Sequence, residues 1–228
     1  MSTAALISGI CWTFVYVLTV YRGIKDKSYG MPLVALALDL SWEFVYSFIY
    51  PPTDAGLGLT IINTVWCLLD FVILYTFLKN GYQHMTQNYT ISKSVFYLMT
   101  VVSFALCFLF MYVSGPFFKD LPYFGGQTFE VGKFIAHYQN VVMGALFVHM
   151  FYLRKKTGQG VKGLSLYAAI FKMLGTSLTV GVTQLFSHPG NWYMIAIAEA
   201  ANLIFDSWYV ILLYKELKAE GLSPWKRL

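Results

Sequence analysis

Two carboxyl groups lie inside one of the most apolar stretches of the chain, ALDLSWEFVYSFIYPP at residues 37–52. Asp39 and Glu43 are four residues apart, a spacing that places both on the same face of a helix. An ionised carboxylate in the hydrocarbon of a bilayer is costly, so such residues are rare, face the protein interior and mark a function. The pair therefore predicts a buried site that uses acids.

Polar side chains recur at helical spacing in three further apolar stretches, so each stretch has one polar face. Because lipid cannot satisfy polar groups, all four faces are expected to point into a common interior. The members of the four faces, in chain order, are Asp39, Trp42, Glu43 and Tyr46; Asn63, Trp66 and Asp70; Lys172, Thr176, Thr179 and Thr183; and Glu199, Asn202, Asp206 and Tyr209.

Such a combination of acids and aromatic rings suits one kind of chemistry. Burial favours the protonated form of a carboxyl group, and several carboxyls close together retain at least one proton among them. Aromatic faces attract a cation, by about 2 kcal/mol or more when the site is desolvated. The pattern predicts a site that protonates a hydrophobic substrate and steers the carbocation that results.

The elements that must position these residues are predicted to be membrane helices. Of the 228 residues, 57% are apolar and only 12% are charged, which is typical of a membrane protein. A spanning helix needs about 20 mostly apolar residues. We expect one all-α membrane domain, residues 1–228, with no removable signal peptide and seven transmembrane helices, at about 4–21, 32–50, 57–78, 94–113, 134–153, 164–186 and 192–214.

The orientation follows from lysine and arginine, which concentrate in cytoplasmic loops. Of the sixteen basic residues, thirteen fall on one side of the predicted membrane, Lys119 and Lys133 fall on the other, and Lys172 lies within a span. This bias predicts an outer or lumenal N-terminus and a cytoplasmic C-terminus. The basic residues form no clustered patch, so a nucleic-acid partner is not expected.

An internal repeat is predicted from a shift of 136 residues. Residues 63–79 then fall on 199–215 without a gap, so that Asp70 meets Asp206. Parallel repeats of this kind occur among membrane proteins. The interpretation is a 3+1+3 arrangement, with repeat A at about 4–79, a linker helix at about 94–113 and repeat B at about 134–215.

The charged groups inside the spans are predicted to share one depth. Counted from the basic ends of their helices, Glu43 is about eleven residues in, and Asp70, Lys172 and Asp206 are each about nine. At about 1.5 Å per residue, these levels differ by only about 3 Å. Glu199 lies farther from the basic end. We expect a pocket with an acidic floor, lined by the aromatic members of the polar faces.

The sequence lacks the residues that several classes of membrane protein need for their function. The seventh predicted span has no central lysine for a retinal Schiff base, and no DDxxD-like pair is available to hold magnesium and a diphosphate. HExxH and GxSxG are absent as well. These absences argue against a retinal protein, a magnesium-dependent prenyltransferase or ionising terpene synthase, and an intramembrane protease or lipase.

The seven predicted spans, the Trp42-Glu43 pair and Asp206 in AANLIFDSWY resemble the small membrane-bound terpene cyclases of fungal meroterpenoid and paxilline-type indole-diterpene pathways and their bacterial relatives. The resemblance implies protonation of a terminal epoxide or alkene on a prenylated aromatic or indole substrate, followed by ring closure and deprotonation. It implies Glu43 and Asp206 as the catalytic acids, with no cofactor. The membrane would be the endoplasmic reticulum in a fungus or the cytoplasmic membrane in a bacterium.

Other interpretations stay open. The 3+1+3 layout is shared by sugar-transporting SWEET and PQ-loop carriers, although the Pro-Gln dipeptide of that group is absent here. A non-enzymatic lipid binder is a further alternative. Asp39 and Lys172 are each open to a structural role, because a buried lysine needs an anionic partner and Asp39, Asp70 or Asp206 are candidates. His137 is expected to be a core histidine.

Overall fold

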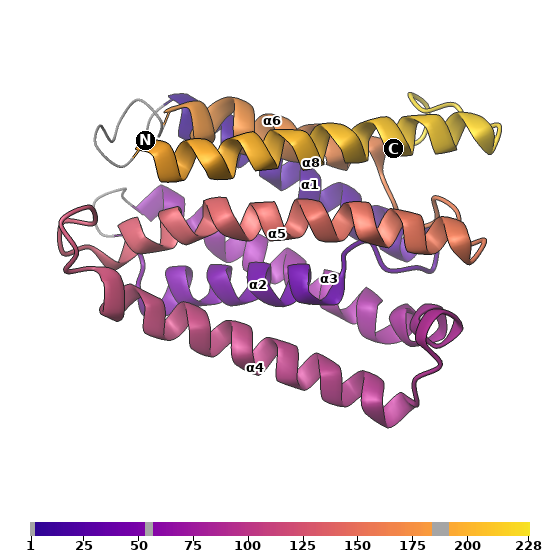
Figure 1. Cartoon of the computed structure of the whole chain (residues 1–228), viewed down its shortest axis with the longest axis horizontal. Coiled ribbons are helices and arrows are strands. Elements are labelled where there is room, and N and C mark those ends of the chain that lie inside the picture. Colours follow the sequence, from indigo (N-terminus) through magenta and orange to yellow (C-terminus); the bar gives the residue numbers. More distant parts are fainter. Residues whose placement is uncertain (1–2, 53–56, 184–191) are drawn as a thin grey trace.

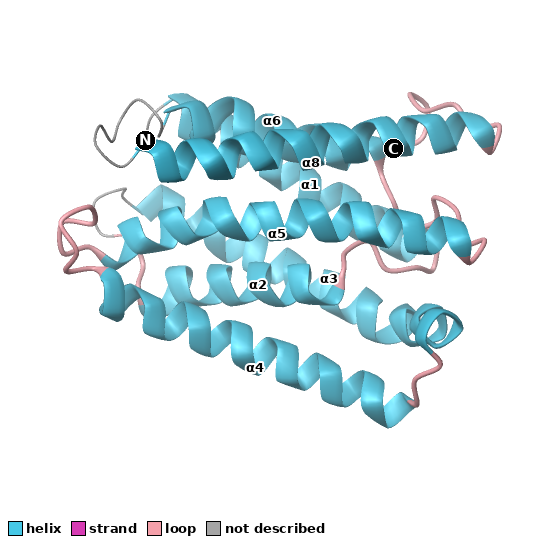
Figure 2. Ribbon diagram, in the orientation of Figure 1, coloured by secondary structure: helices cyan, strands magenta, loops and turns pink. Residues whose placement is uncertain are grey.

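The computed structural model describes residues 3–52, 57–183 and 192–228. This part of the chain is all-helical, as predicted, and its loops lie at the two ends of an elongated bundle (Figures 1 and 2). Its seven α-helices are α1 (Thr3–Lys25), α2 (Leu33–Phe44), α3 (Leu57–Tyr89), α4 (Lys93–Phe118), α5 (Thr128–Lys156), α6 (Leu166–Gly175) and α8 (Trp192–Ala219).

Five of these helices, α1, α3, α4, α5 and α8, are long and apolar enough to cross a bilayer. Helices α2 and α6 are shorter, and each continues as a π-helical segment, Val45–Ile49 and Thr176–Gly181. The predicted spans 32–50 and 164–186 are therefore helical without being uniform α-helices. The outer end of the second of these spans, from residue 184, lies outside the described residues.

Several helices extend well beyond the predicted spans. Helix α3 continues to Tyr89 and α4 to Phe118, so that Pro116 lies inside the last turn of α4 instead of in a loop. The predicted spans are shorter than the helices because hydropathy marks only the part of a helix that is apolar enough for lipid. The remainder carries polar residues that can leave the hydrocarbon, where periodicity gives no boundary.

The helices pack in a defined order. Helix α1 packs against α6 and α3, α5 packs against α8, and α2 lies among α3, α4 and α5. Helix α4 forms one edge of the bundle and diverges from its neighbours toward the end that carries Lys93 (Figure 1). Its outward face is a row of exposed apolar side chains, including Leu98, Val101, Leu106 and Leu109, as expected of a helix that faces lipid.

Two glycines allow helices to approach closely. A Cβ atom on Gly132 of α5 would lie 2.6 Å from the ring of Tyr46, which follows α2. A Cβ atom on Gly175 of α6 would lie 2.9 Å from the Cβ atom of Cys11 in α1. Small residues at helix contacts are how membrane bundles achieve tight packing.

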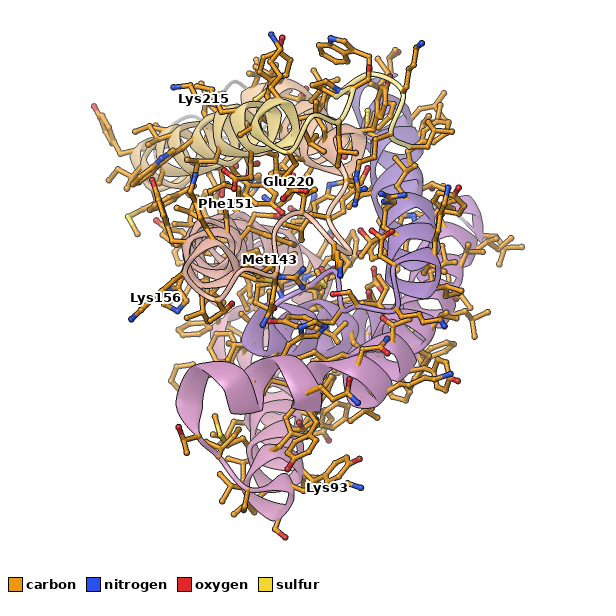
Figure 3. The ribbon with its side chains drawn as sticks, turned by 90° about the vertical axis from the view of Figure 1, so that its right-hand side faces the viewer. Lys93, Met143, Phe151, Lys156, Lys215 and Glu220 are labelled. Atoms are coloured by element: carbon orange, nitrogen blue, oxygen red, sulfur yellow. The ribbon has the colours of Figure 1, made fainter. Side chains whose placement is uncertain are left out.

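The basic end of the bundle is held by buried ionic groups. Arg154, at the end of α5, is almost fully buried and donates hydrogen bonds to the backbone oxygens of Tyr29 and Lys162. Asp26 accepts hydrogen bonds from the backbone of Gly163 and from Arg227, each at 2.8 Å. Figure 3 views this end directly, with the lysines it labels, Lys93, Lys156 and Lys215, at the periphery.

Candidate active site

Three carboxyl groups meet inside the bundle. Asp39 and Glu43 come from α2 and Asp70 from α3, and one oxygen of each lies within 4.8 Å of the others. Their exposed fractions are 5%, 0% and 0%. The spacing of Asp39 and Glu43 on one helical face predicted this convergence, and the contact between α2 and α3 adds the third member. We call Asp39, Glu43 and Asp70 the acidic cluster.

Two side chains from other helices bind the acidic cluster. The hydroxyl of Tyr16, on α1, lies within hydrogen-bond distance of Glu43 Oε1 and 3.0 Å from Asp39 Oδ2. The amide of Gln139, on α5, donates to Asp39 Oδ1 at 2.9 Å. Side chains from α1, α2 and α5 therefore form one buried hydrogen-bonded group, and Asp70 from α3 lies against it.

A cavity of about 190 Å³ borders this group. Asp39, Glu43 and Tyr16 form part of its wall, together with Trp42 and Trp66. Both tryptophans are fixed by hydrogen bonds from their indole nitrogens, from Trp42 to the backbone oxygen of residue 132 at 2.8 Å and from Trp66 to the hydroxyl of residue 13 at 3.0 Å. The cavity thus offers both acids and π faces to a ligand.

The cavity lies in one half of the bundle. Its walls come from the first parts of α1, α3 and α5 and the last parts of α2 and α6, all of which are remote from the basic end. A larger apolar groove of about 680 Å³ lies between α4 and α5 and shares Gln139 with the cavity. It contains none of the acids, so the smaller cavity is the candidate site.

Asp206 lies outside the acidic cluster and binds Lys172. The ammonium of Lys172, on α6, donates to both carboxylate oxygens of Asp206, on α8, at 2.7 and 3.0 Å. Both residues are buried. Lys172 also interacts electrostatically with Asp39, so this ion pair adjoins the acidic cluster. Of the three partners considered for Lys172, Asp206 is the one in direct contact.

A third polar group lies between α5 and α8. Glu199 contacts Nδ1 of His137, and the amide of Asn202 donates to the backbone oxygen of His137 at 3.2 Å and to Glu199 at 3.3 Å. His137 lines the cavity, whereas Glu199 and Asn202 support it from behind. The predicted polar face of the seventh span therefore meets the fifth helix.

The structure brings only part of the predicted pocket together. Asp39, Trp42, Glu43 and Trp66 line the cavity, but the two predicted tyrosines do not. Tyr46 packs against the backbone of α5, and Tyr209 packs in the main hydrophobic core. In both cases the aromatic ring lies on the predicted helical face, but a neighbouring helix covers it. The other predicted residues that are absent from the cavity lining are Asp70, Glu199, Asn202 and Asp206.

Sequence reasoning missed Tyr16 and Gln139. Tyrosine is common near span ends, so Tyr16 gave no distinct signal within 4–21. Gln139 is an uncharged amide, but the rule that drew attention to the acids applies to it too, because an amide in lipid also lacks partners. That rule could have found Gln139 within the span at 134–153.

The arrangement can hold and donate a proton inside an aromatic cavity. Three carboxyls at this spacing also resemble the ligand set of a divalent cation. Tyr16 and Gln139 each donate to one oxygen of Asp39. Each of these oxygens keeps a further lone pair, and Glu43 Oε2 and both oxygens of Asp70 have no partner among the described residues, so the three carboxyls have the donor set either to share protons or to hold a cation.

Comparison with curated proteins finds fungal cyclases. Terpene cyclase macJ of Penicillium terrestre is 31% identical over 115 residues, which cover 50% of this chain and 43% of macJ. Terpene cyclase pyr4 of Aspergillus fumigatus is 36% identical over 84 residues, which cover 36% of this chain and 34% of pyr4. The matched stretches thus span less than half the length of these two relatives.

A longer alignment reaches the Pyr4-family terpene cyclase mfmH of Annulohypoxylon moriforme, at 23% identity over 223 residues, which cover 92% of this chain and 86% of mfmH. No solved structure matches the chain. The family model of Pyr4-like transmembrane terpene cyclases matches residues 1–218. With its apolar helices and buried acids, this integral membrane protein belongs to the family of Pyr4-like transmembrane terpene cyclases.

Proposed function

We propose that the chain is a metal-independent terpene cyclase that starts its reaction by protonation. Its substrate is a prenylated aromatic or indole compound, of the meroterpenoid type, that carries a terminal epoxide or alkene. The observation that supports this most directly is Glu43, which is fully buried, lines an aromatic cavity and adjoins two further carboxyls. A protonated carboxyl in such a place can give its proton to a substrate group held inside the cavity.

Glu43 is the proton donor in this proposal. It transfers its proton to the epoxide oxygen or to the terminal alkene carbon, and a tertiary carbocation forms on the substrate. Trp42 and Trp66, which line the cavity beside Glu43, stabilise that cation through their π faces. Ring closure follows, and loss of a proton from the cyclised cation completes an isomerisation that needs neither a metal nor an organic cofactor.

Asp206 acts through Lys172 in this mechanism. Because both oxygens of Asp206 accept hydrogen bonds from Lys172, the ion pair fixes an ammonium group within electrostatic range of Asp39. A fixed charge next to the acidic cluster helps to set how many protons the cluster retains. Asp206 is thus assigned to the control of the acid, and Glu43 to the transfer itself.

The architecture proposed for the membrane has seven spans in a 3+1+3 repeat. Helices α2 and α6, with their π-helical continuations, complete the set of spans to seven. The contacts favour the repeat: α1 packs against α3 and α6, and its counterpart α5 packs against α8 and α2. Helix α4, which lies at the edge of the bundle, is the linker (Figure 1).

In the proposed orientation, the basic end of the bundle is cytoplasmic and the N-terminus is lumenal or outside. The loops at 26–32 and 157–165 and the last residues of the chain all belong to the basic end. The membrane in this proposal is the endoplasmic reticulum if the chain is fungal, as the named relatives are, and the cytoplasmic membrane if it is bacterial.

The test is incubation of the purified protein with a panel of prenylated phenols and indoles and their terminal epoxides, with products analysed by mass spectrometry and NMR. A cyclised product of unchanged mass supports the cyclase. Unchanged substrate that co-purifies with the protein supports a lipid binder, and substrate accumulated by sealed vesicles supports a carrier.

Chelation tests the metal-independent part of the proposal. Because the proposed first step is proton transfer and the sequence has no DDxxD-like pair to hold magnesium and a diphosphate, turnover should be unchanged in EDTA. The measurement is the initial cyclisation rate after dialysis against chelator. Loss of activity that magnesium restores would contradict protonation as the initiating step.

A further inference from the structure

We propose that Tyr16 is a positioning residue that keeps the acidic proton on Glu43 and stabilises the carboxylate after the proton leaves. In the resting protein its hydroxyl accepts a hydrogen bond from protonated Glu43 and donates one to ionised Asp39. The inference rests on the proposed function for its catalytic consequence, but the resting hydrogen-bond arrangement can be tested without any substrate.

The first step is to count the protons. The hydroxyl oxygen of Tyr16 lies within hydrogen-bond distance of Asp39 Oδ2, at 3.0 Å, and of Glu43 Oε1. A tyrosine hydroxyl has one proton, so it can donate to only one of these carboxyls. The second contact is a hydrogen bond only if the other carboxyl is protonated and donates to the tyrosine oxygen.

The second step is to decide which carboxyl carries the proton. Both oxygens of Asp39 have donors, Tyr16 for one and Gln139 for the other. Within the described part of the chain, Glu43 Oε2 has no hydrogen-bond partner. A buried charge costs far more than a buried neutral group when its hydrogen bonds are incomplete. The negative charge therefore belongs on Asp39 and the proton on Glu43.

The surrounding charges agree with this assignment. Lys172, from α6, interacts electrostatically with Asp39, and its ammonium supplies the nearby positive charge. Asp70, from α3, has no hydrogen-bond partner on either oxygen among the described residues and is fully buried, so it too must be neutral. Cys67 of α3 and His137 and Lys133 of α5 are further titratable groups nearby.

The third step concerns proton transfer. The O–H of Glu43, which points to Tyr16 in the resting protein, first turns toward the bound substrate; when its proton is transferred, the electrons of the broken O–H bond remain on Oε1. Tyr16 then no longer accepts a hydrogen bond there, and its own O–H can rotate from Asp39 to Glu43. Gln139 continues to donate to Asp39. The new carboxylate thus gains a donor at the moment it forms, which is how a preorganised donor lowers a barrier.

The first test is infrared spectroscopy of the resting protein. A protonated carboxylic acid has a C=O stretching band distinct from that of a carboxylate. We expect one component of this band to disappear in Glu43→Gln and to persist in Asp39→Asn. In Tyr16→Phe it should move to higher frequency, because the acid loses its hydrogen-bond acceptor. Loss of the component in Asp39→Asn, or its persistence in Glu43→Gln, would overturn the assignment.

The second test is kinetic. Tyr16→Phe keeps the ring and its packing but removes the donor that would reach Glu43. Removal of one donor to a developing charge typically costs about a hundredfold to a thousandfold in kcat. We expect a kcat loss of roughly a hundredfold with KM changed by less than about threefold. Gln139→Met, which leaves Asp39 with Tyr16 alone, should reduce kcat by a smaller factor.

The matched control is Tyr29→Phe, which removes a phenol hydroxyl from another buried tyrosine, near the basic end. It should leave kcat unchanged, and melting temperatures of all variants identify any that are merely unstable. Full kcat in a folded Tyr16→Phe would overturn the proposal. If the wild type cyclises none of the substrates, the proposed function fails, while the infrared result still decides the hydrogen-bond arrangement.

Discussion

Glu43 is the residue on which the proposed chemistry depends. It has no exposed surface, and its carboxyl borders the cavity. Glu43→Gln keeps the shape of the side chain but cannot donate an acidic proton. Since a general acid contributes about a hundredfold to ten-thousandfold, we expect turnover to fall by this factor while substrate binding persists. Single-turnover rates and substrate affinity, measured on the same preparation, give the result.

Glu216→Gln is the control for Glu43→Gln, because Glu216 pairs with Lys155 at the basic end, away from the cavity. A purely structural Glu43 leads to the opposite expectation. A neutral amide is easier to bury than an acid, so the variant would keep its turnover and gain thermal stability. Retained turnover in Glu43→Gln would rule out the proposed mechanism.

A double substitution can separate the proposed role of Asp206 in the reaction from its structural role as the ion-pair partner of Lys172. Asp206→Asn leaves the buried ammonium of Lys172 without its partner, which typically costs about 3–5 kcal/mol of stability. We expect lower stability and much lower turnover. Adding Lys172→Met removes the unpaired charge, so thermal stability should return while turnover stays low. If the double variant recovered both thermal stability and turnover, the ion pair between Asp206 and Lys172 would be a structural contact with no part in the reaction.

The sequence predicts the centre of the site better than its surroundings. Asp39 and Glu43 share one helical face, and this local geometry needs no knowledge of the fold. Tyr16 and Gln139 reach the same point from helices that are distant in sequence, a contact that periodicity cannot reveal. Asp206 was predicted to lie at nearly the same depth as Lys172 and Glu43, but depth alone does not say that Lys172, and not Glu43, is its direct partner.

Among the helices, α5 approaches the π-helical segment after α2 closely, next to the Trp42 side of the cavity. A Cβ atom on Gly132 would lie 2.6 Å from the ring of Tyr46. We therefore expect Gly132→Ala to push the helices apart and to destabilise the protein by about 1–3 kcal/mol. The measurement is the melting temperature in detergent, together with turnover, since Trp42 bonds to the backbone of residue 132.

Gly58→Ala is the matched control for this packing effect. Gly58 lies in α3, and a Cβ atom added to it meets nothing within 4 Å. Alanine is also the better helix former, so this variant should be neutral or slightly stabilising. Equal melting temperatures for Gly132→Ala and Gly58→Ala would show that the structure accommodates the added methyl group at residue 132 without loss of stability.

Individual helices were predictable from the sequence only over the part of each helix that is apolar enough to lie in lipid. Long apolar runs gave α1, α3, α4, α5 and α8, but the runs end where the hydrocarbon ends and the helices do not. The π-helical segments Val45–Ile49 and Thr176–Gly181 were not predictable, because a π turn changes the helical period only locally. Such segments are frequent at functional sites.

At the scale of the whole molecule, the two ends of the bundle differ in charge, and this predicts its orientation. Thirteen of sixteen basic residues belong to one end. Glycosylation reporters fused to the two termini should therefore be modified at the N-terminus only, and the acceptor motif at Asn88 should stay unmodified. Modification of the C-terminal reporter, or at Asn88, would reverse the assigned orientation.

The overall arrangement was predictable only in outline. Composition indicated an all-α membrane protein, and the structure confirms the all-helical fold. Which helices touch depends on side-chain fit, for example at Gly175 against Cys11, and such fit has no signature in hydropathy. The predicted repeat stays a prediction, although the paired helix contacts are those it would require.

The position of the cavity has a consequence for supply. Its walls belong to the half of the bundle remote from the basic end, which the proposed orientation places in the lumenal leaflet. A prenylated compound released into the cytosolic leaflet must therefore flip across the bilayer before it can react. In vesicles whose outer surface is the basic end, the cyclisation rate should then follow transbilayer movement of the substrate, and a scramblase or a short-chain substrate that flips quickly should accelerate it.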